Sequence, residues 1–244
     1  MKKRICLILL FVALLCSCST ISYTKLPYFA NFGLPGEVVL TGKAKYYIPD
    51  VPCMERITLV YNQSDEVCGL LEGYYNKFIL KQVLSKNNIS INGRSDFDYI
   101  FYGFGRTFFS TVNADEICEK RVKNGAAVLD IETANKMRNA DLAIYANKPD
   151  IGYKNLDTLV LTVNGDVFSM DVETVSETAA SSFLKLLKSD FNTFETKSGI
   201  KSEQIFSQID GHFFLEGTKV SIRELNEPAY LENWVRRIFS HGNN

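Results

Sequence analysis

The sequence predicts an α+β fold in which an antiparallel sheet is packed by helices. Two glycine turns, at Asn164-Gly165 and at Glu216-Gly217, each separate a pair of strand-like runs. Asn-Gly supplies the positive φ that a two-residue hairpin requires. Between the two turns, an apolar stripe from Ala180 to Phe191 recurs at helical spacing. A hairpin, a helix and a second hairpin in succession are typical of sheets whose helices lie on one face.

The N-terminal half adds strands at 37–48 and 56–61, both rich in valine, leucine and isoleucine. Ser64 is a suitable N-cap, and the apolar residues that follow it, from Val67 to Phe78, recur at helical spacing. We therefore expect a helix from Ser64 to about Lys86, although Gly69 and Gly73 disfavour it. Aromatic runs at 98–104 and 106–112 predict a hairpin that is buried on both faces or lines a groove.

The C-terminal half contains the most regular patterns. We expect a helix at 133–138, a strand at 141–146, a hairpin of 158–163 with 166–172, a second hairpin of 211–215 with 218–222, and a last helix that begins near Pro228. Thr174 and Glu177 have the spacing of a capping box for the helix after the first hairpin. Residues 56–104 and 166–222 share an order of strand, polar cap, helix and hairpin, which suggests a duplicated unit.

The N-terminus has the pattern of a secretory signal. Lys2, Lys3 and Arg4 precede an apolar run that ends at Leu15. This run is about eleven residues long, and a helix needs roughly 20 to span a bilayer. The segment Leu15-Cys16-Ser17-Cys18 resembles the lipobox of bacterial lipoprotein precursors.

The lipobox resemblance implies cleavage between Ser17 and Cys18 and acylation of Cys18, with diacylglycerol and a further fatty chain such as palmitate. Several acyl chains would hold the protein on a membrane. Cys16 is a competing site, and an ordinary cleaved signal peptide or an uncleaved anchor are the alternatives. Ser19 after the lipid cysteine points to the outer membrane in the sorting logic of this family. The rest of the chain is loosely similar to uncharacterised lipoproteins of spirochaetes.

These patterns divide the chain into a signal peptide at 1–17, a lipidated tether at 18–36, and two α+β halves at 37–125 and 126–240 that can form one domain. Loss of the signal lowers the number of basic residues from 27 to 24, against 28 acidic residues, so the net charge becomes −4. A nucleic-acid partner is therefore not expected, because such binding asks for a basic face.

Three cysteines follow the lipobox, namely Cys53, Cys68 and Cys118. An oxidising envelope permits a disulfide between Cys53 and Cys68, the nearest pair. Three buried thiols are the alternative that we favour, because cysteine is among the most buried residue types.

No catalytic residue, metal site or cofactor is expected from the sequence. None of the hydrolase, metalloprotease or phosphate-loop motifs is present, and His212 stands among aromatic residues without a local partner. Asp96 and Asp98 are spaced to lie on one face of a strand and are the best candidates for a hydrolase. Tyr74, Tyr99 and Tyr102 are the candidates for a ligand pocket, since tyrosine combines a stacking face with a hydroxyl group.

We therefore expect a membrane-anchored envelope lipoprotein that is not an enzyme, and that binds an apolar ligand or a protein partner of the envelope. A periplasmic hydrolase that uses Asp96 or Asp98 and a structural surface protein are the alternatives.

Overall fold

The computed structural model describes residues 37–46, 53–61, 67–87, 97–101, 105–114, 116, 129–149, 151–198 and 210–240. The predicted signal peptide, the lipobox with Ser17 and Cys18, and the tether at 18–36 lie outside these residues. Asp96, Tyr102 and Cys118 also lie outside them. Within the described ranges, no helix combines the length and apolarity that crossing a membrane requires.

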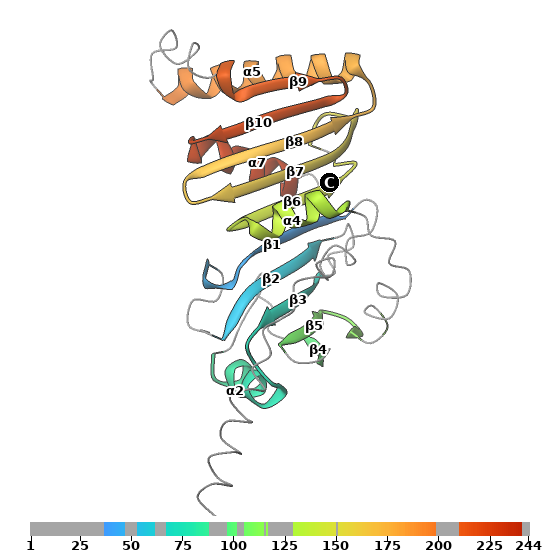
Figure 1. The fold of residues 1–244 in the computed structure, drawn as a ribbon, viewed down its shortest axis with the longest axis vertical. Coiled ribbons are helices and arrows are strands. Elements are labelled where there is room, and N and C mark those ends of the chain that lie inside the picture. Colours follow the sequence, from blue (N-terminus) through green and yellow to red (C-terminus); the bar gives the residue numbers. More distant parts are fainter. Residues whose placement is uncertain are drawn as a thin grey trace, which may run out of the picture.

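The described residues form one ten-stranded antiparallel sheet with helices on its faces, which confirms the predicted fold class (Figure 1). The N-terminal strands are β1 (Val38–Lys43), β2 (Met54–Tyr61), β3 (Val67–Gly73), β4 (Asp98–Phe101) and β5 (Arg106–Ser110). The C-terminal strands are β6 (Leu142–Asn147), β7 (Leu156–Asn164), β8 (Val167–Thr174), β9 (Phe213–Glu216) and β10 (Lys219–Leu225). The α-helices are α2 (Lys77–Asn87), α4 (Ile131–Asn139), α5 (Glu177–Ser198) and α7 (Pro228–Ser240), and the 3-10 helices are η2 (Ala44–Tyr46) and η3 (Asp210–His212).

The strand order is the same in the two halves of the sheet. The full order is β4-β5-β3-β2-β1-β6-β7-β8-β10-β9, and β1 pairs with β6 at the centre. Counted from the outer edge inwards, the N-terminal half is β4-β5-β3-β2-β1 and the C-terminal half is β9-β10-β8-β7-β6. This order is what a repeated unit requires, while the duplication itself stays a prediction. The predicted boundary at 125–126 lies outside the described residues.

Alternation along the central strands assigns the helices to the two faces of the sheet. Ile144 and Ala146 of β6 pack in the core beneath α5 and α7, whereas Ala143 and Tyr145 pack in the core beneath α4. Helix α4 therefore lies on the face of the sheet opposite α5 and α7 (Figure 1).

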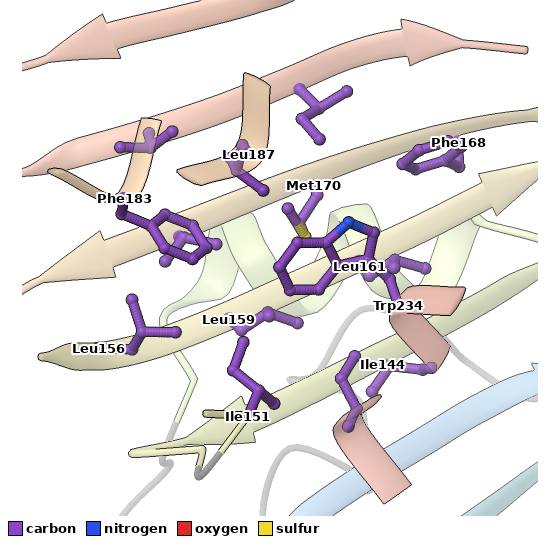
Figure 2. Close-up of a cluster of buried hydrophobic side chains, with 14 of the residues drawn as sticks. Ile144, Ile151, Leu156, Leu159, Leu161, Phe168, Met170, Phe183, Leu187 and Trp234 are labelled. Atoms are coloured by element: carbon purple, nitrogen blue, oxygen red, sulfur yellow. The ribbon is translucent and has the colours of Figure 1, made fainter. Parts of the chain in front are cut away.

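The largest of three buried apolar clusters in the described residues lies between α5, α7 and strands β6 to β10 (Figure 2). Trp234 of α7 is 1% exposed and makes an edge contact with Phe183 of α5, at 6.1 Å between ring centroids. Leu159 and Leu161 of β7 and Met170 of β8 meet these rings from the sheet. The apolar residues that alternate along β7 and β8 thus pack against the apolar stripe of α5, as the sequence pattern predicts.

The predicted helix from Ser64 to Lys86 is wrong in its first part. Residues Val67–Gly73 form strand β3, and the helix begins only at Lys77. All seven residues of β3 are buried, and such a run on a two-sided strand mimics the spacing of a helix face. Gly69 is needed in this strand because a Cβ there would lie 2.1 Å from the Thr58 carbonyl oxygen.

The capping box predicted at Thr174 and Glu177 is also wrong. Ser176 caps helix α5, since its Oγ accepts a hydrogen bond from the Ala179 N–H at 3.2 Å. The Thr174 hydroxyl donates instead to the carbonyl oxygens of Ser176 and Thr218. Thr218 belongs to the turn of the β9–β10 hairpin, 44 residues away, so the local sequence does not reveal this contact.

Cys53 and Cys68 are not bonded to each other. Cys68 pairs with Val60 near the start of β3, whereas Cys53 lies beside Tyr74, just past its end. At about 3.3 Å per strand residue the two cysteines are roughly 20 Å apart, and a disulfide needs Cα atoms within about 7 Å. Cys68 is buried and Cys53 is half-buried.

Candidate functional site

A polar groove lies beside helix α4 on the sheet face opposite α5 and α7. Its cavity has a volume of about 880 Å³. The lining residues come from α4 and its cap, from β8 and β10, and from η3 and β9: Asp130, Glu132, Thr133, Lys136, Ser169, Asp171, Gly211, His212, Phe214, Lys219, Ile222, Arg223 and Glu224. We call this cavity the α4 groove.

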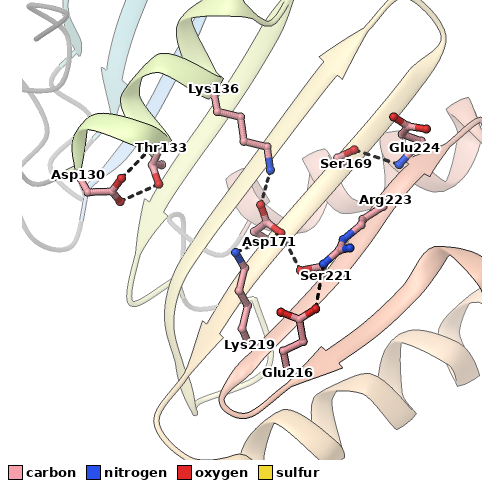
Figure 3. A network of polar contacts seen from close by, with 10 residues as sticks. All are labelled: Asp130, Thr133, Lys136, Ser169, Asp171, Glu216, Lys219, Ser221, Arg223 and Glu224. Atoms are coloured by element: carbon pink, nitrogen blue, oxygen red, sulfur yellow. Dashed lines mark hydrogen bonds and ion pairs between the residues drawn. The ribbon is translucent and has the colours of Figure 1, made fainter.

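Asp171 of β8 is the centre of the hydrogen-bond network in the α4 groove (Figure 3). Its carboxylate accepts hydrogen bonds from the Lys136 ammonium group and, at 2.7 Å, from the Ser221 hydroxyl, while Lys219 Nζ lies 3.8 Å away. Burial opposes ionisation of this carboxyl group, but the contacts with Lys136 and Ser221 outweigh it and lower the pKa of Asp171. The floor of the groove therefore carries a fixed negative charge between two lysines.

The rim of the α4 groove is set by the N-terminus of α4. Asp130 is the N-cap, and its two carboxylate oxygens accept from the Thr133 N–H and hydroxyl, each at 2.8 Å. These hydrogen bonds lower the pKa of Asp130. An aspartate at the N-cap favours the helix start at Ile131 through both hydrogen bonding and the helix dipole.

Strand β10 is bulged where it borders the α4 groove. The register with β8 shifts between Ile222 and Leu225, and Glu224 takes a φ of 53°, which is uncommon for a residue other than glycine. The Glu224 N–H donates to Ser169 Oγ at 3.0 Å, which holds the bulge in place. Bulges that re-aim side chains are over-represented next to functional sites.

The bulge aims Arg223 across the surface of β9. Its guanidinium lies 4.2 Å from the centroid of the Phe214 ring and 3.2 Å from a carboxylate oxygen of Glu216. The Arg223 carbonyl oxygen lies 2.6 Å from His212 Nδ1. One wall of the α4 groove is thus formed by the Arg223 guanidinium stacked on the Phe214 ring, with the Glu216 carboxylate beside it.

The tyrosines predicted to line a pocket are placed differently from one another. Tyr74 is exposed and its hydroxyl contacts Glu55, while Tyr99 packs its ring against Phe97 and Phe109. Burial raises the pKa of Tyr99. Neither residue lines the α4 groove, and their role as ligand contacts stays a prediction.

The carboxylate of Asp98 is occupied by backbone groups. Its two oxygens accept from the N–H groups of Tyr99 and Ala114, each at 3.0 Å, so that Asp98 ties β4 to the chain after β5. In the part of the chain that the structure describes, no three histidine, cysteine or acidic side chains gather as a metal site would require.

Sequence reasoning did not single out Asp171, Lys136 or Glu224. Ser169, Asp171 and Glu173 alternate with buried Phe168, Met170 and Val172 along β8, so a row of polar side chains on the second face is visible in the sequence. The partners of that row come from α4 and β10, at separations of 35 and 50 residues. No local pattern marks contacts at such separations.

Comparisons with known proteins yield a fold and nothing closer. Neither protein-family profiles nor curated protein sequences give a match. Two solved structures of TP0453, a protein of the spirochaete Treponema, resemble the chain. Crystal form IV aligns with a TM-score of 0.53 and 10% identity over 86% of this chain and 97% of that chain. Crystal form I aligns with a TM-score of 0.51 and 8% identity over 88% and 99%. The chain therefore shares its fold with a spirochaetal protein.

Proposed function

We propose that this chain is a lipid-anchored, non-enzymatic binding module of a bacterial cell envelope, and that its α4 groove receives a segment of a protein partner. The observation that carries the proposal is the chemistry of the groove lining. Four carboxylates (Asp130, Glu132, Asp171 and Glu224) face three cations (Lys136, Lys219 and Arg223). Interleaved charges of both signs suit a polypeptide, whose side chains can match each in turn, better than an apolar small molecule.

A protein partner also fits the aromatic content of the groove. Phe214, which stacks with Arg223, is its chief accessible apolar side chain, because the Ile222 side chain is buried in the core on the other face of the sheet. Aromatic residues and arginine are the side chains most enriched at the centres of protein interfaces. The stack of Arg223 on Phe214 would serve as the anchor of the interface, with the lysines and carboxylates around it.

Two features support a role without catalysis. Asp98, the sequence candidate for a hydrolase, already accepts two backbone hydrogen bonds. His212 has its Nδ1 beside the Arg223 carbonyl oxygen, a contact that holds η3 against the bulge of β10. Both side chains thus stabilise local structure.

The anchor and the envelope location are the second half of the proposal. They are supported by the lipobox at Leu15-Cys16-Ser17-Cys18 and by a fold shared with a protein of Treponema. A Cys18→Ala variant should move the protein from the membrane fraction to the soluble fraction. Intact mass of the native protein should show acyl chains on the cysteine, and a plain amino terminus would contradict the anchor.

The partner is tested by site-specific photo-crosslinking in intact cells. A photo-reactive residue replaces Glu132 on the groove rim, and a matched one replaces Lys185, an exposed residue of α5 on the opposite face. We expect one adduct of defined mass from position 132, absent at 185 and lost when Arg223→Glu is added. Equal adducts at both positions, or none at 132, would refute a docking role for the α4 groove.

A further inference from the structure

The sheet ends in two edge strands, β4 and β9, whose backbone groups are engaged differently. An edge strand presents N–H and C=O groups without a ladder partner, and these groups can pair with a further strand. In β4 the Asp98 carboxylate accepts a hydrogen bond from the Tyr99 N–H, so a side chain of the strand itself occupies a backbone donor. Among the described residues, no side chain bonds a backbone group of β9 in this way.

The hairpin turn fixes which backbone groups of β9 point away from the sheet. Glu216 and Lys219 lie opposite one another and close a two-residue turn. In such a hairpin the closing residues exchange backbone hydrogen bonds, and bonded and non-bonded pairs then alternate along the strands. Glu216 and Phe214 are therefore bonded to β10. Leu215 and Phe213 each direct one N–H and one C=O outwards from the edge.

Helix α5 lies along this edge, on one face of the sheet (Figure 1). Its Phe191 ring meets the Phe213 ring edge-on, at 6.1 Å between centroids, and both side chains are buried. Leu215 is on the same face as Phe213, because alternate residues of a strand share a face, yet it is 41% exposed. A further strand beside β9 would cover Leu215 and place its own apolar side chains under α5.

The other face of β9 is continuous with the α4 groove. Phe214 lines the groove, with the Arg223 guanidinium 4.2 Å from the centroid of its ring. Ser221, which is opposite Phe214 in the ladder, donates to Asp171 at the groove floor. A strand added to β9 would therefore extend this floor outwards, with its side chains next to the Arg223–Phe214 stack.

The position of α5 distinguishes a single added segment from a second copy of the chain. Two β9 edges paired antiparallel about a two-fold axis would lie about 4.8 Å apart and would bring both α5 helices to the same face. Packed helices need roughly 8–10 Å between their axes. Because α5 packs on β9 itself, two copies would overlap there. A single extended segment occupies only the plane of the sheet and avoids this overlap.

We propose that β9 receives an extended segment of the protein partner as an additional strand, paired through the outward N–H and C=O groups of Phe213 and Leu215. The inference rests on the proposed function, because the same segment would lie beside the α4 groove. In this mode of recognition, backbone hydrogen bonds supply affinity and the side chains that alternate between the two faces supply specificity. The segment therefore carries apolar residues on the side of α5, and polar or aromatic residues on the side of Phe214.

The edge and the groove are separated by photo-crosslinking in intact cells at two positions. A photo-reactive residue replaces Leu215 at the edge or Glu132 at the groove rim. We expect one partner adduct of the same mass from both positions. An adduct at 215 alone would support the edge and refute the groove, whereas an adduct at 132 alone would keep the groove and overturn the inference. An adduct made of two copies of this chain would also overturn it.

A proline at position 215 tests the backbone pairing itself. Leu215→Pro removes the outward N–H and places the ring where the added strand would lie, while Phe214 and Glu216 keep their hydrogen bonds to β10. Leu215→Ala is the matched control, since it loses the same side chain but keeps the N–H. We expect the adduct yield from position 132 to fall about tenfold more in the proline variant than in the alanine variant. Equal yields in the two variants would overturn the inference.

Amide hydrogen exchange of the purified full chain in non-ionic detergent checks the edge without the partner. The Leu215 N–H should exchange faster than the Phe214 N–H, because only the latter is bonded to β10. Slow exchange at Leu215 in the isolated chain would mean that the edge is already covered, and would overturn the inference. If Leu215→Pro does not fold, Leu215→Lys takes its place in the crosslinking, because a lysine on an edge strand opposes pairing and leaves the backbone unchanged.

Discussion

Strands β3 and β8 occupy the same place in the two halves of the sheet but bury their side chains differently. Each is third from its outer edge. In β8 every second residue is buried, whereas all seven residues of β3 are buried. On the face of the sheet that carries α4, Cys68 and Leu70 of β3 belong to an apolar cluster with Phe108, Ala114 and Leu129, whereas Lys136 of α4 reaches across to Asp171 of β8. The side chains that cover this face therefore make the difference: apolar side chains close it over β3, and charged side chains line the α4 groove over β8.

The comparison also explains how the two cavities differ. Helix α4 contributes residues to both: Glu132, Thr133 and Lys136 line the α4 groove, and Asn135, Arg138 and Asn139 line a second cavity at its C-terminal end. The groove lies on a sheet face that water reaches, and charges of both signs are tolerated there. At the C-terminal end of α4, Arg56 and Glu72 are only 9% and 4% exposed, and a charge buried in this way needs a partner.

The largest effect that we predict falls on the one-faced core of the C-terminal half. Trp234→Ala should lower the free energy of unfolding by about 4 kcal/mol, because the ring is 1% exposed and truncation leaves a cavity between α5 and α7. Urea denaturation measures this change. The control is Phe78→Ala, at a ring that is 82% exposed, with an expected change within about 0.5 kcal/mol. Equal losses in the two variants would contradict the assignment of the core.

The next effect tests the burial of β3 on both faces. Gly69→Ala should cost about 3 kcal/mol, because the new Cβ would meet the Thr58 carbonyl oxygen at 2.1 Å and the Phe109 ring at 2.6 Å. In Gly165→Ala, in the β7–β8 turn, the new Cβ would have no atom within 4 Å. The only cost is the φ of 58°, which should lower the free energy of unfolding by about 1–2 kcal/mol. A Gly69→Ala protein as stable as Gly165→Ala would show that β3 has room on one face. Thermal and urea unfolding compare the pair.

The two halves should respond to acid with opposite signs at their buried carboxyl groups. The folded-state pKa of Asp171 is lowered below its usual 3.8, so its contribution to stability is present above that pH and is lost as the pH falls through the folded pKa. Burial raises the folded-state pKa of Glu72 above its usual 4.5, although Arg106, Arg138 and Arg56 pull it down. Glu72 therefore costs stability above its folded pKa, and that cost is relieved as the pH falls towards 4.5.

Unfolding of Asp171→Asn and Glu72→Gln across the acid range measures both contributions. The unchanged protein should be more stable than Asp171→Asn at neutral pH, and this difference in the free energy of unfolding should shrink by about 1–2 kcal/mol below pH 3.8. Relative to Glu72→Gln, it should gain stability as the pH falls from neutral towards 4.5. If the stability difference from the unchanged protein changed in the same direction with falling pH for both variants, the two halves would not differ in this way.

The smallest predicted effect concerns the start of α5. Ser176→Ala should lower the free energy of unfolding by about 1 kcal/mol, because it removes the acceptor for the Ala179 N–H. Glu177→Gln keeps the shape of the side chain and should change stability by less than about 0.5 kcal/mol. A larger loss at Glu177 than at Ser176 would restore the capping box that the sequence suggests.

Much of the fold follows from local sequence. The hairpins at Gly165 and Gly217 form as predicted, with φ values of 58° and 61°, and helices α4 and α7 lie where periodicity places them. The prediction failed at β3, because burial on both faces removes the alternation that identifies a strand. It also missed the α4 groove, whose members come from α4, β8, β10 and η3.

By itself, the sequence determined where the two C-terminal hairpins turn, where helices α4 and α7 lie, and which face of the regular strands is apolar. These features depend on backbone conformation and on side-chain spacing within a few residues. Only the tertiary structure decided the order of the ten strands, the face on which α4 packs, and the meeting of Lys43, Arg56 and Glu72 in one row. Those contacts join residues far apart in the chain, and their free energy depends on burial that exists only after the sheet has formed.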